Sequence, residues 1–282
     1  MNRGFLGLVV LALFGCGAQP VKNTTAARQE AAIEANRKGE AYVRHGELES
    51  AARSYREALR LSQSLEDAEG IAANAINLSI VRQRQGRFAD ARASLAAVLE
   101  QPNLRFSQLR LAEVTLRHAL LDLDQNRFAG ANEWVNQAGK HCGERCPLSG
   151  AIHNVRAQLA LQAGRVEEAA AAARSAQDAS RAAGDRPELA NALRLLGISS
   201  LQRGDAAAAR THLEQALAID RELGASRKIA LDLLALGRAA ALGGDRDAAR
   251  AYYTRAMAVS EADRDNAGVA EARAMLDAAT GK

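Results

Sequence analysis

The segment KHCGERCPLSG, residues 140–150, combines the side chains best suited to chemistry, because His141, Cys142 and Cys146 lie close together in it. Cysteines four residues apart in a turn or at a helix end can reach the Cα separation that a disulfide permits. Outside the cytoplasm paired cysteines usually form such a bond, so we expect a structural disulfide. Two alternatives stay open: a metal site, which lacks a clear fourth ligand, and a redox pair, which more often has the spacing Cys-x-x-Cys.

The other histidines do not form a catalytic arrangement in the sequence. His45, His118, His153 and His212 lie far apart, and no helical register brings any of them together with a serine, a cysteine or a pair of carboxylates in a catalytic arrangement. A glycine-rich phosphate loop and the HExxH zinc motif are both missing. Trp134 falls among apolar positions and is expected to pack in the core. The sequence thus predicts a protein that is not an enzyme, with no metal and no small-molecule substrate.

The N-terminus has the layout of an export signal. Arg3 precedes an apolar run over residues 5–14, and the small residue Gly15 follows. The run has about half of the roughly twenty residues that a membrane-spanning helix needs. Its end, LFGC, resembles the lipobox of bacterial lipoproteins. This resemblance implies that residues 1–15 are a signal peptide and that Cys16 becomes the acylated first residue of the mature protein. A signal peptide that contains a cysteine by coincidence is the alternative.

A lipid at Cys16 would determine where the protein acts. Two or three acyl chains hold a protein firmly on a membrane, whereas a single chain holds it only marginally. Gly17 stands where lipoproteins retained in the inner membrane commonly have aspartate. The resemblance therefore implies the periplasmic side of the outer membrane in a Gram-negative cell. Residues 16–30 have no apolar period and are expected to form a flexible tether. The covalent lipid is the only cofactor that we expect.

The composition favours helices and gives little sign of nucleic-acid binding. Of the 282 residues, 48% are hydrophobic but only 4% are aromatic, and there are four prolines. Alanine and leucine, which favour helices, dominate the rest. The formal net charge of +4 is small for this length, and the arginines are scattered along the chain. We therefore expect no nucleic-acid partner and assign most arginines to solvated helix faces.

A repeated pattern covers most of the chain from residue 31 to residue 282. The segment KGEAYVRHGELESAARSYREALRL, residues 38–61, resembles a tetratricopeptide repeat, with small and apolar residues at the family's signature spacing. If Gly39 is position 8, the first repeat starts at Ala32. The same register recurs at starts separated by 40, 40, 38, 40 and 40 residues. The later repeats start at Ala72, Ala112, Gly150, Ala190 and Ala230.

The repeat predicts an all-α, right-handed superhelix of about six helical hairpins, followed by a capping helix over residues 266–278. A left-handed turn inside each hairpin explains a repeated glycine or asparagine, since these residues adopt positive φ most easily. These turn residues are Gly46, Gly86, Asn126, Gly164, Gly204 and Gly244. Because the period exceeds the family's usual 34, we expect the second helices to run about one turn longer. Their predicted ends are Gly70, Gly184, Gly224 and Gly268.

The first helices of such a superhelix line its concave face, where the register places arginines and amides. An extended peptide suits this mixture, because amides pair with its backbone and guanidinium groups pair with carboxylates. The predicted groove residues are Asn36, Arg37, Arg44, Asn77, Arg84, Arg117, Asn154, Gln158, Asn191, Arg194 and Arg238.

The two resemblances together imply a lipid-anchored scaffold that binds envelope proteins through its repeats. Similar lipoproteins include the pilotins of type IV pili and secretion systems, and assembly factors for outer-membrane proteins and polysaccharide export. The alternative functions are a peptide-sensing regulator of an envelope enzyme, and a metal or redox protein that uses Cys142 and Cys146.

Overall fold

The computed structural model describes residues 24–101, 103–143 and 146–280, and their regular structure is entirely helical. Cys16 and the predicted signal peptide lie outside the described residues. Within these ranges no helix combines the length and the apolar character needed to cross a membrane. The helices are α1 (Thr24–Arg44), α2 (Leu48–Ser64), α3 (Ala68–Arg84), α4 (Phe88–Leu99), α5 (Gln108–Asp124), α6 (Phe128–Cys142), α7 (Ser149–Gln162), α8 (Val166–Ala183), α9 (Arg186–Gln202), α10 (Ala206–Glu222), α11 (Ser226–Leu242), α12 (Arg246–Ala262) and α13 (Asn266–Thr280).

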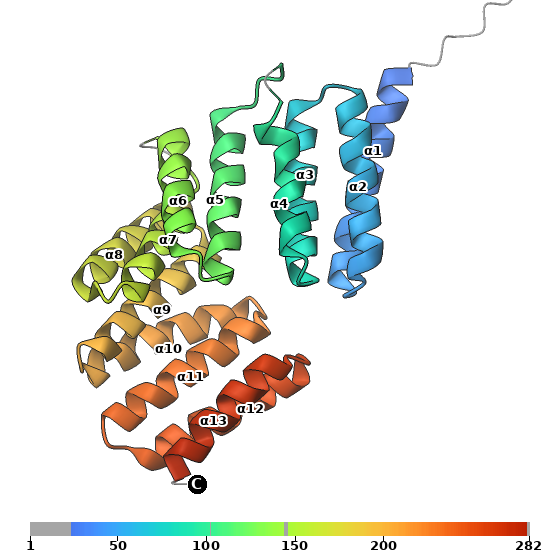
Figure 1. Ribbon diagram of the computed structural model, residues 1–282. Coiled ribbons are helices and arrows are strands. Elements are labelled where there is room, and N and C mark those ends of the chain that lie inside the picture. Colours follow the sequence, from blue (N-terminus) through green and yellow to red (C-terminus); the bar gives the residue numbers. More distant parts are fainter. Residues whose placement is uncertain (1–23, 102, 144–145, 281–282) are drawn as a thin grey trace, which may run out of the picture.

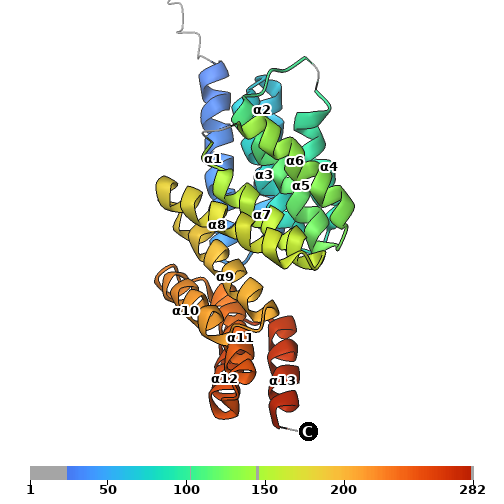
Figure 2. The same cartoon turned by 90° about the vertical axis from the view of Figure 1, so that its left-hand side faces the viewer.

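The helices form six consecutive hairpins, from α1–α2 to α11–α12, and α13 packs on the last of them. Figures 1 and 2 show the hairpins stacked in chain order into a curved array, with α1 and α13 at opposite ends. Each hairpin buries apolar residues against the next one, so the core runs along the whole array. This arrangement confirms the predicted all-α solenoid of six hairpins and a capping helix.

The turn within each hairpin confirms the predicted register. Gly46 has φ +76° and Asn126 has φ +56°, and the glycines at the four equivalent turns are also left-handed. Aspartate side chains begin several of the helices that follow a turn. Asp67 Oδ1 accepts from Gly70 N at 3.1 Å, and Asp245 Oδ1 accepts from Ala248 N at 2.9 Å. These caps satisfy backbone donors that a helix N-terminus otherwise leaves unbonded.

The predicted helix ends are correct at two turns and wrong at two others. Gly184 directly follows α8, and Gly224 lies two residues after the last residue of α10; both have positive φ, as predicted. Gly70 and Gly268 instead lie in the first turns of α3 and α13. The left-handed residues at these two turns are Glu66 and Arg264.

Two further boundaries differ from the predictions, each for its own physical reason. The first helices begin about one turn before the predicted repeat starts, as α3 does at Ala68 rather than Ala72, so the long period lengthens both helices of a hairpin. Helix α1 likewise begins at Thr24, inside the tether expected over residues 16–30. The sequence TTAARQEAAIEA favours a helix strongly enough to extend α1 beyond the part that packs on α2.

Residue sizes at the closest approach of paired helices are complementary. Where the second helix carries a large side chain, the first carries glycine, since a Cβ on Gly39 would lie 2.7 Å from Tyr55 and a Cβ on Gly237 would lie 2.3 Å from Tyr253. The hairpin α5–α6 has the buried pair Ala119 and Val135 at the same positions. The combined volume of the two side chains at the helix crossing therefore stays roughly constant from one of these hairpins to another.

We expect Gly237→Ala to lower the free energy of unfolding by about 1–2 kcal/mol, because overpacking against Tyr253 outweighs the gain in helix propensity. In a Tyr253→Val background the same change should be neutral or stabilising, since it recreates the pair Ala119 and Val135. Urea unfolding of the four proteins in this cycle measures both effects. Equal costs of Gly237→Ala in the two backgrounds would contradict the size argument.

Candidate functional site

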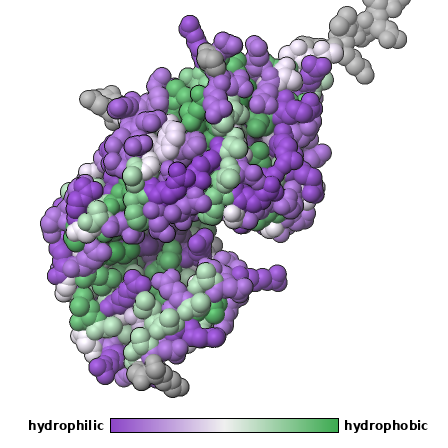
Figure 3. All heavy atoms as spheres, in the orientation of Figure 1, coloured by the Kyte–Doolittle hydropathy of each residue, from purple (hydrophilic) through white to green (hydrophobic). Residues whose placement is uncertain are grey.

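The curved array has a concave groove on the side of the first helices. A cavity of about 520 Å³ lies between α5, α7, α9, α11 and α13, and a second of about 370 Å³ lies between α3 and α5. Leu116 and Leu120 of α5 line both cavities, so the two adjoin and are here together called the concave groove. In Figure 3 the surface is hollowed between the N-terminal and C-terminal halves, and the hollow contains both hydrophobic and hydrophilic side chains.

The structure brings seven of the eleven predicted groove residues into the concave groove. Five of these line the larger cavity and two line the smaller one: Asn154, Gln158, Asn191, Arg194 and Arg238, then Asn77 and Arg117.

The other four predicted residues line neither of these cavities. Arg37, Arg44 and Arg84 are exposed, and Arg37 pairs with Glu34 on its own helix at 2.5 Å. Asn36 Nδ2 donates to Asn74 Oδ1 at 2.6 Å, which links the first two repeats. The N-terminal end of the predicted surface is therefore a solvated helix face and an inter-repeat contact.

The apolar lining of the groove was not part of the sequence prediction. The main apolar side chains in the two cavities, besides those of α5, are Ile76, Ile80, Val155, Leu161, Leu195, Ile198, Leu231 and Leu234. Ile80 and Leu231 each expose 37% of their surface, although both are large hydrophobic residues. The repeat register could have predicted this apolar lining. Apolar residues recur at the same concave positions of the first helices from which the arginines and amides were predicted.

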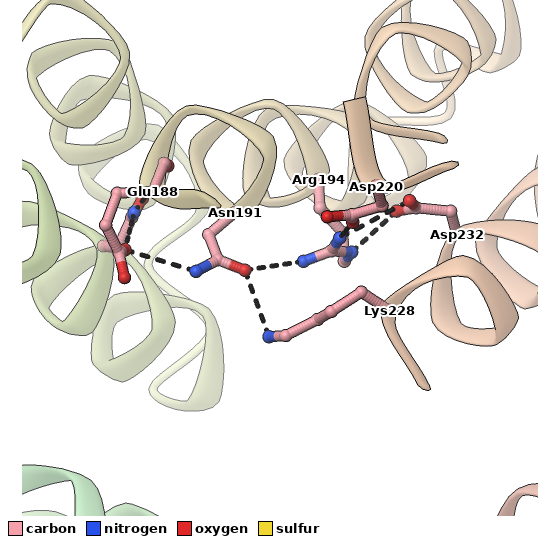
Figure 4. A network of polar contacts seen from close by, with 7 residues as sticks. Glu188, Asn191, Arg194, Asp220, Lys228 and Asp232 are labelled. Atoms are coloured by element: carbon pink, nitrogen blue, oxygen red, sulfur yellow. Dashed lines mark hydrogen bonds and ion pairs between the residues drawn. The ribbon is translucent and has the colours of Figure 1, made fainter. Parts of the chain in front are cut away.

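Two asparagines at the centre of the groove, Asn154 and Asn191, are bonded to neighbouring protein groups. Figure 4 shows Asn191 between Glu188, Arg194 and Lys228. Asn154 Nδ2 donates to Glu188 Oε2 at 2.7 Å and to the backbone oxygen of Glu188 at 2.9 Å. Asn191 Nδ2 donates to Glu188 Oε2 at 3.2 Å, and Asn191 Oδ1 accepts from Arg194 at 2.8 Å and from Lys228 at 3.0 Å. These contacts fix the amides in place.

Arg194 lies behind this layer and joins two buried carboxylates. Its guanidinium bonds to Asp232 Oδ1 at 2.6 Å and to Asp220, and the three residues expose 7%, 0% and 2% of their surfaces respectively. Burial raises the pKa of Asp232 to about 7, while the Arg194 guanidinium opposes that rise. Arg194 thus lines the groove, but its charge is compensated within the protein and ties α9 to α10 and α11.

Arg117 is the opposite case, a buried guanidinium with no carboxylate bonded to it. It exposes 9% of its surface and donates to Ser79 Oγ and the Ser79 backbone oxygen at 3.3 Å each, and to Gln83 Oε1. Burial lowers its pKa to about 10, and the nearby charge of Asp124 only partly opposes this shift. Arg117 therefore brings a largely uncompensated positive charge to the smaller cavity.

Lys228 brings a second positive charge to the larger cavity. It is exposed at the surface and bonds to the amide oxygen of Asn191, but among the described residues it forms no ion pair. Surrounding protein removes enough water to lower its pKa, and the positive charge of Arg194 adds to this effect. The nearby carboxylates of Glu188, Asp220 and Asp232 oppose part of this shift. Because Lys228 is exposed and forms no ion pair in the described residues, its ammonium can approach an anionic group in the groove.

The structure joins Cys142 and Cys146 in a disulfide, with their Cα atoms 5.2 Å apart. The bond connects the end of α6 to the chain that enters α7, where the period shortens to 38 residues. His141 Nδ1 lies 2.9 Å from Gln108 Oε1. Among the described residues no three histidine, cysteine, aspartate or glutamate side chains gather into a metal site. The disulfide also occupies the two thiolates that the metal alternative requires.

Removing this disulfide should destabilise the protein by about 2 kcal/mol, because the bond closes a short loop and restricts the unfolded chain. Urea unfolding of the oxidised protein, compared with a Cys142→Ala/Cys146→Ala variant, measures the difference. Adding a reductant should lower the urea unfolding midpoint of the parent protein only. A reductant that leaves both midpoints unchanged would show that the two thiols are free.

His118, on α5, stacks on Trp134 of α6 away from the groove. Their ring centroids lie 4.4 Å apart with an interplanar angle of 16°. Burial lowers the pKa of His118 to about 4, while Asp122 opposes this shift and Arg92 and Arg117 add to it. The imidazole is therefore neutral at pH 7, and both rings pack in the core, as predicted for Trp134.

Known proteins share this architecture. Residues 148–222 match the tetratricopeptide-repeat family, and no curated protein sequence matches the chain. The STAND protein (Signal Transduction ATPase with Numerous Domains) from Pyrococcus horikoshii, with its tetratricopeptide repeat sensor, is 13% identical with a TM-score of 0.62 over 92% of this chain and 38% of that one. The Rap protein complexed with Competence and Sporulation Factor is 15% identical with a TM-score of 0.61, over 88% of this chain and 68% of that one. PilW, a widely conserved type IV pilus biogenesis factor, is 20% identical with a TM-score of 0.52, over 74% and 93%.

The described residues define an α-solenoid whose concave groove is lined by the first helix of successive hairpins. The repeat register, the left-handed turns and the match over residues 148–222 identify its class. Residues 148–222 match the tetratricopeptide-repeat family, and the other described hairpins share its fold. Proteins of this fold typically serve as scaffolds for interactions between proteins.

Proposed function

We propose that this protein is a membrane-anchored scaffold that binds a segment of a partner protein in its concave groove during assembly of a cell-envelope complex. The observation that carries the proposal is the groove itself, which continues across α3, α5, α7, α9 and α11 with exposed apolar and charged side chains. A concave surface of this kind buries a peptide segment along its length. The shared fold with PilW, a pilus biogenesis factor, favours an assembly role.

The proposed anchor is a lipid on Cys16, supported by the sequence LFGC at the end of a short apolar run. A lipid would place the protein on the periplasmic side of the outer membrane. Confinement to a membrane raises the effective concentration of the scaffold for partners on the same surface, without any additional contact. The anchor and the groove then act together, since the groove selects the partner and the anchor positions it.

The test is crosslinking in cells of the full chain with a C-terminal tag, followed by mass spectrometry. We expect the parent protein and a control variant, Leu223→Glu, to capture the same envelope complex. Leu223 is a suitable control because it exposes 43% of its surface and lies outside the groove cavities. Leu231→Glu, inside the groove, should reduce the capture strongly, and Cys16→Ala should abolish it. Identical captures by all four proteins would refute both the groove and the anchor.

A peptide-sensing regulator is the second candidate, and the Rap protein complexed with Competence and Sporulation Factor favours it through its similar fold. In that case a soluble peptide, rather than a structural partner, would occupy the groove. A regulator should gain thermal stability when the peptide is added. A scaffold should instead co-purify with a stable complex, which a regulator that captures only a soluble peptide would not do.

A further inference from the structure

Building on the proposed function, we propose that the occupant of the concave groove is an amphipathic α-helix of another protein, with acidic residues beside its apolar face. This differs from the extended peptide that the sequence favours. Three features of the groove support a helix: its apolar strip, its bonded amides, and two cations, Arg117 and Lys228, that form no ion pair among the described residues.

The apolar strip fits the apolar face of a helix. Ile80 of α3, Leu120 of α5 and Ile198 of α9 occupy equivalent positions on their first helices, with Gln158 at that position of the intervening α7, and Leu231 of α11 lies beyond them. Ile80 and Leu231 remain more than one third exposed without a partner. An amphipathic helix presents apolar residues at intervals of three and four, which form a stripe of this kind.

Asn154 and Asn191 at the groove centre offer little to an extended backbone, because most of their side-chain hydrogen-bonding capacity is used within the protein. A bound extended chain exposes its own N–H and C=O groups and needs partners for them. Asn191 already uses both of its side-chain atoms, and Asn154 Nδ2 donates twice to Glu188. Asn154 Oδ1 is buried away from solvent, where a bound chain cannot reach it. A helix satisfies its backbone groups internally, so it requires none of these atoms.

The charges beside the strip favour acidic residues on the helix. Arg117 bonds only to uncharged acceptors, and Lys228 bonds only to an amide oxygen. Among the other charges of the lining, Arg238 pairs with Glu271 at 3.3 Å, whereas the carboxylate of Glu188 accepts from two neutral amides and lies near enough to Lys228 to oppose part of the fall in its pKa. Carboxylates of the occupant would compensate the two remaining cations.

The test is a pooled selection on the purified full chain with two displayed peptide libraries of about 16 residues, the length of a helix of about 24 Å. One library encodes leucine at helical spacing with mixed charges, and the other encodes random sequences that include proline. We expect the selected peptides to carry leucine at intervals of three and four, with glutamate or aspartate alongside. Synthetic versions should be weakened about tenfold or more by Leu231→Glu and left unchanged by Leu223→Glu.

The other outcomes separate this inference from the proposed function. Selected peptides that contain proline or carry basic residues, and that still depend on Leu231, would overturn the acidic helix and leave the groove scaffold standing. Peptides that bind Leu231→Glu as well as the parent protein, or an empty selection, would overturn both. The charge argument has its own check: Lys228→Glu should weaken acidic peptides and strengthen versions with lysine in place of glutamate.

Discussion

Replacing Arg194 with leucine is expected to lower the free energy of unfolding by about 3–5 kcal/mol, because the change leaves two carboxylates buried without their shared cation. Asp232 is fully buried and Asp220 exposes 2% of its surface, so water cannot replace the guanidinium. The loss should be smaller at pH 5 than at pH 8. Burial already raises the pKa of Asp232, and loss of the guanidinium raises it further, so that at low pH the carboxyl is neutral.

A matched control comes from the next interface of the same chain. The positions equivalent to Arg194, Asp220 and Asp232 are occupied there by Leu234, Ser260 and Ala272. The triple variant Arg194→Leu/Asp220→Ser/Asp232→Ala copies that interface and should recover most of the lost stability, since an ion pair replaced by packed residues is often tolerated. Urea unfolding followed by circular dichroism measures all three proteins. A cost below about 1 kcal/mol for Arg194→Leu alone would contradict the role of the triad.

The register of the repeats was predictable because it depends on residues whose type is required by one local feature, such as a left-handed turn or a close helix crossing. Asn126 shows this well, since it falls where the other hairpins have glycine, and the structure gives it the left-handed φ of +56°. Small residues at the helix crossings were equally predictable, because Gly39 and Gly237 have no room for a Cβ. Such positions are determined by neighbours in the same hairpin.

The ends of the helices were less predictable, because glycine serves two physical purposes. Gly70 and Gly268 were predicted to be left-handed residues at helix ends, but the structure needs glycine there because a side chain would not fit. A Cβ on Gly70 would lie 2.6 Å from Ser62 Oγ, and a Cβ on Gly268 would lie 2.5 Å from Ser260 Oγ. The left-handed conformation falls instead on Glu66 at one of these turns. A single sequence does not distinguish a glycine needed for its φ from a glycine needed for its size.

The chemistry of the groove was the hardest part to predict, because it depends on contacts between hairpins. Arg194 was predicted as a partner-binding residue, but its acidic partners are 26 and 38 residues away in sequence and lie on α10 and α11. One signal was present: Asp220 stands where three other repeats have serine, at Ser62, Ser180 and Ser260. A charged residue at a position that is otherwise small and buried indicates a buried partner.

Acidification should destabilise the protein through His118 by about 3 kcal/mol between pH 6.5 and pH 4. Burial against Trp134 lowers the folded-state pKa of His118 to about 4, whereas an unfolded histidine has a pKa near 6.5. Between these values the unfolded state binds the proton and the folded state does not. Stability therefore rises with pH across this window and is lost as the pH falls through it.

A His118→Phe variant tests this prediction, because phenylalanine keeps a ring against Trp134 and removes the titration. Unfolding free energies of the two proteins, measured from pH 4 to pH 7, should differ most in slope below pH 6.5. The difference between the two proteins cancels the titration of the surface carboxylates, which both share. Trp134 is the single tryptophan of the chain, so its fluorescence reports unfolding directly beside the titrating ring. Parallel curves for the two proteins would show that His118 keeps an ordinary pKa in the folded state and that the stack does not exclude its proton.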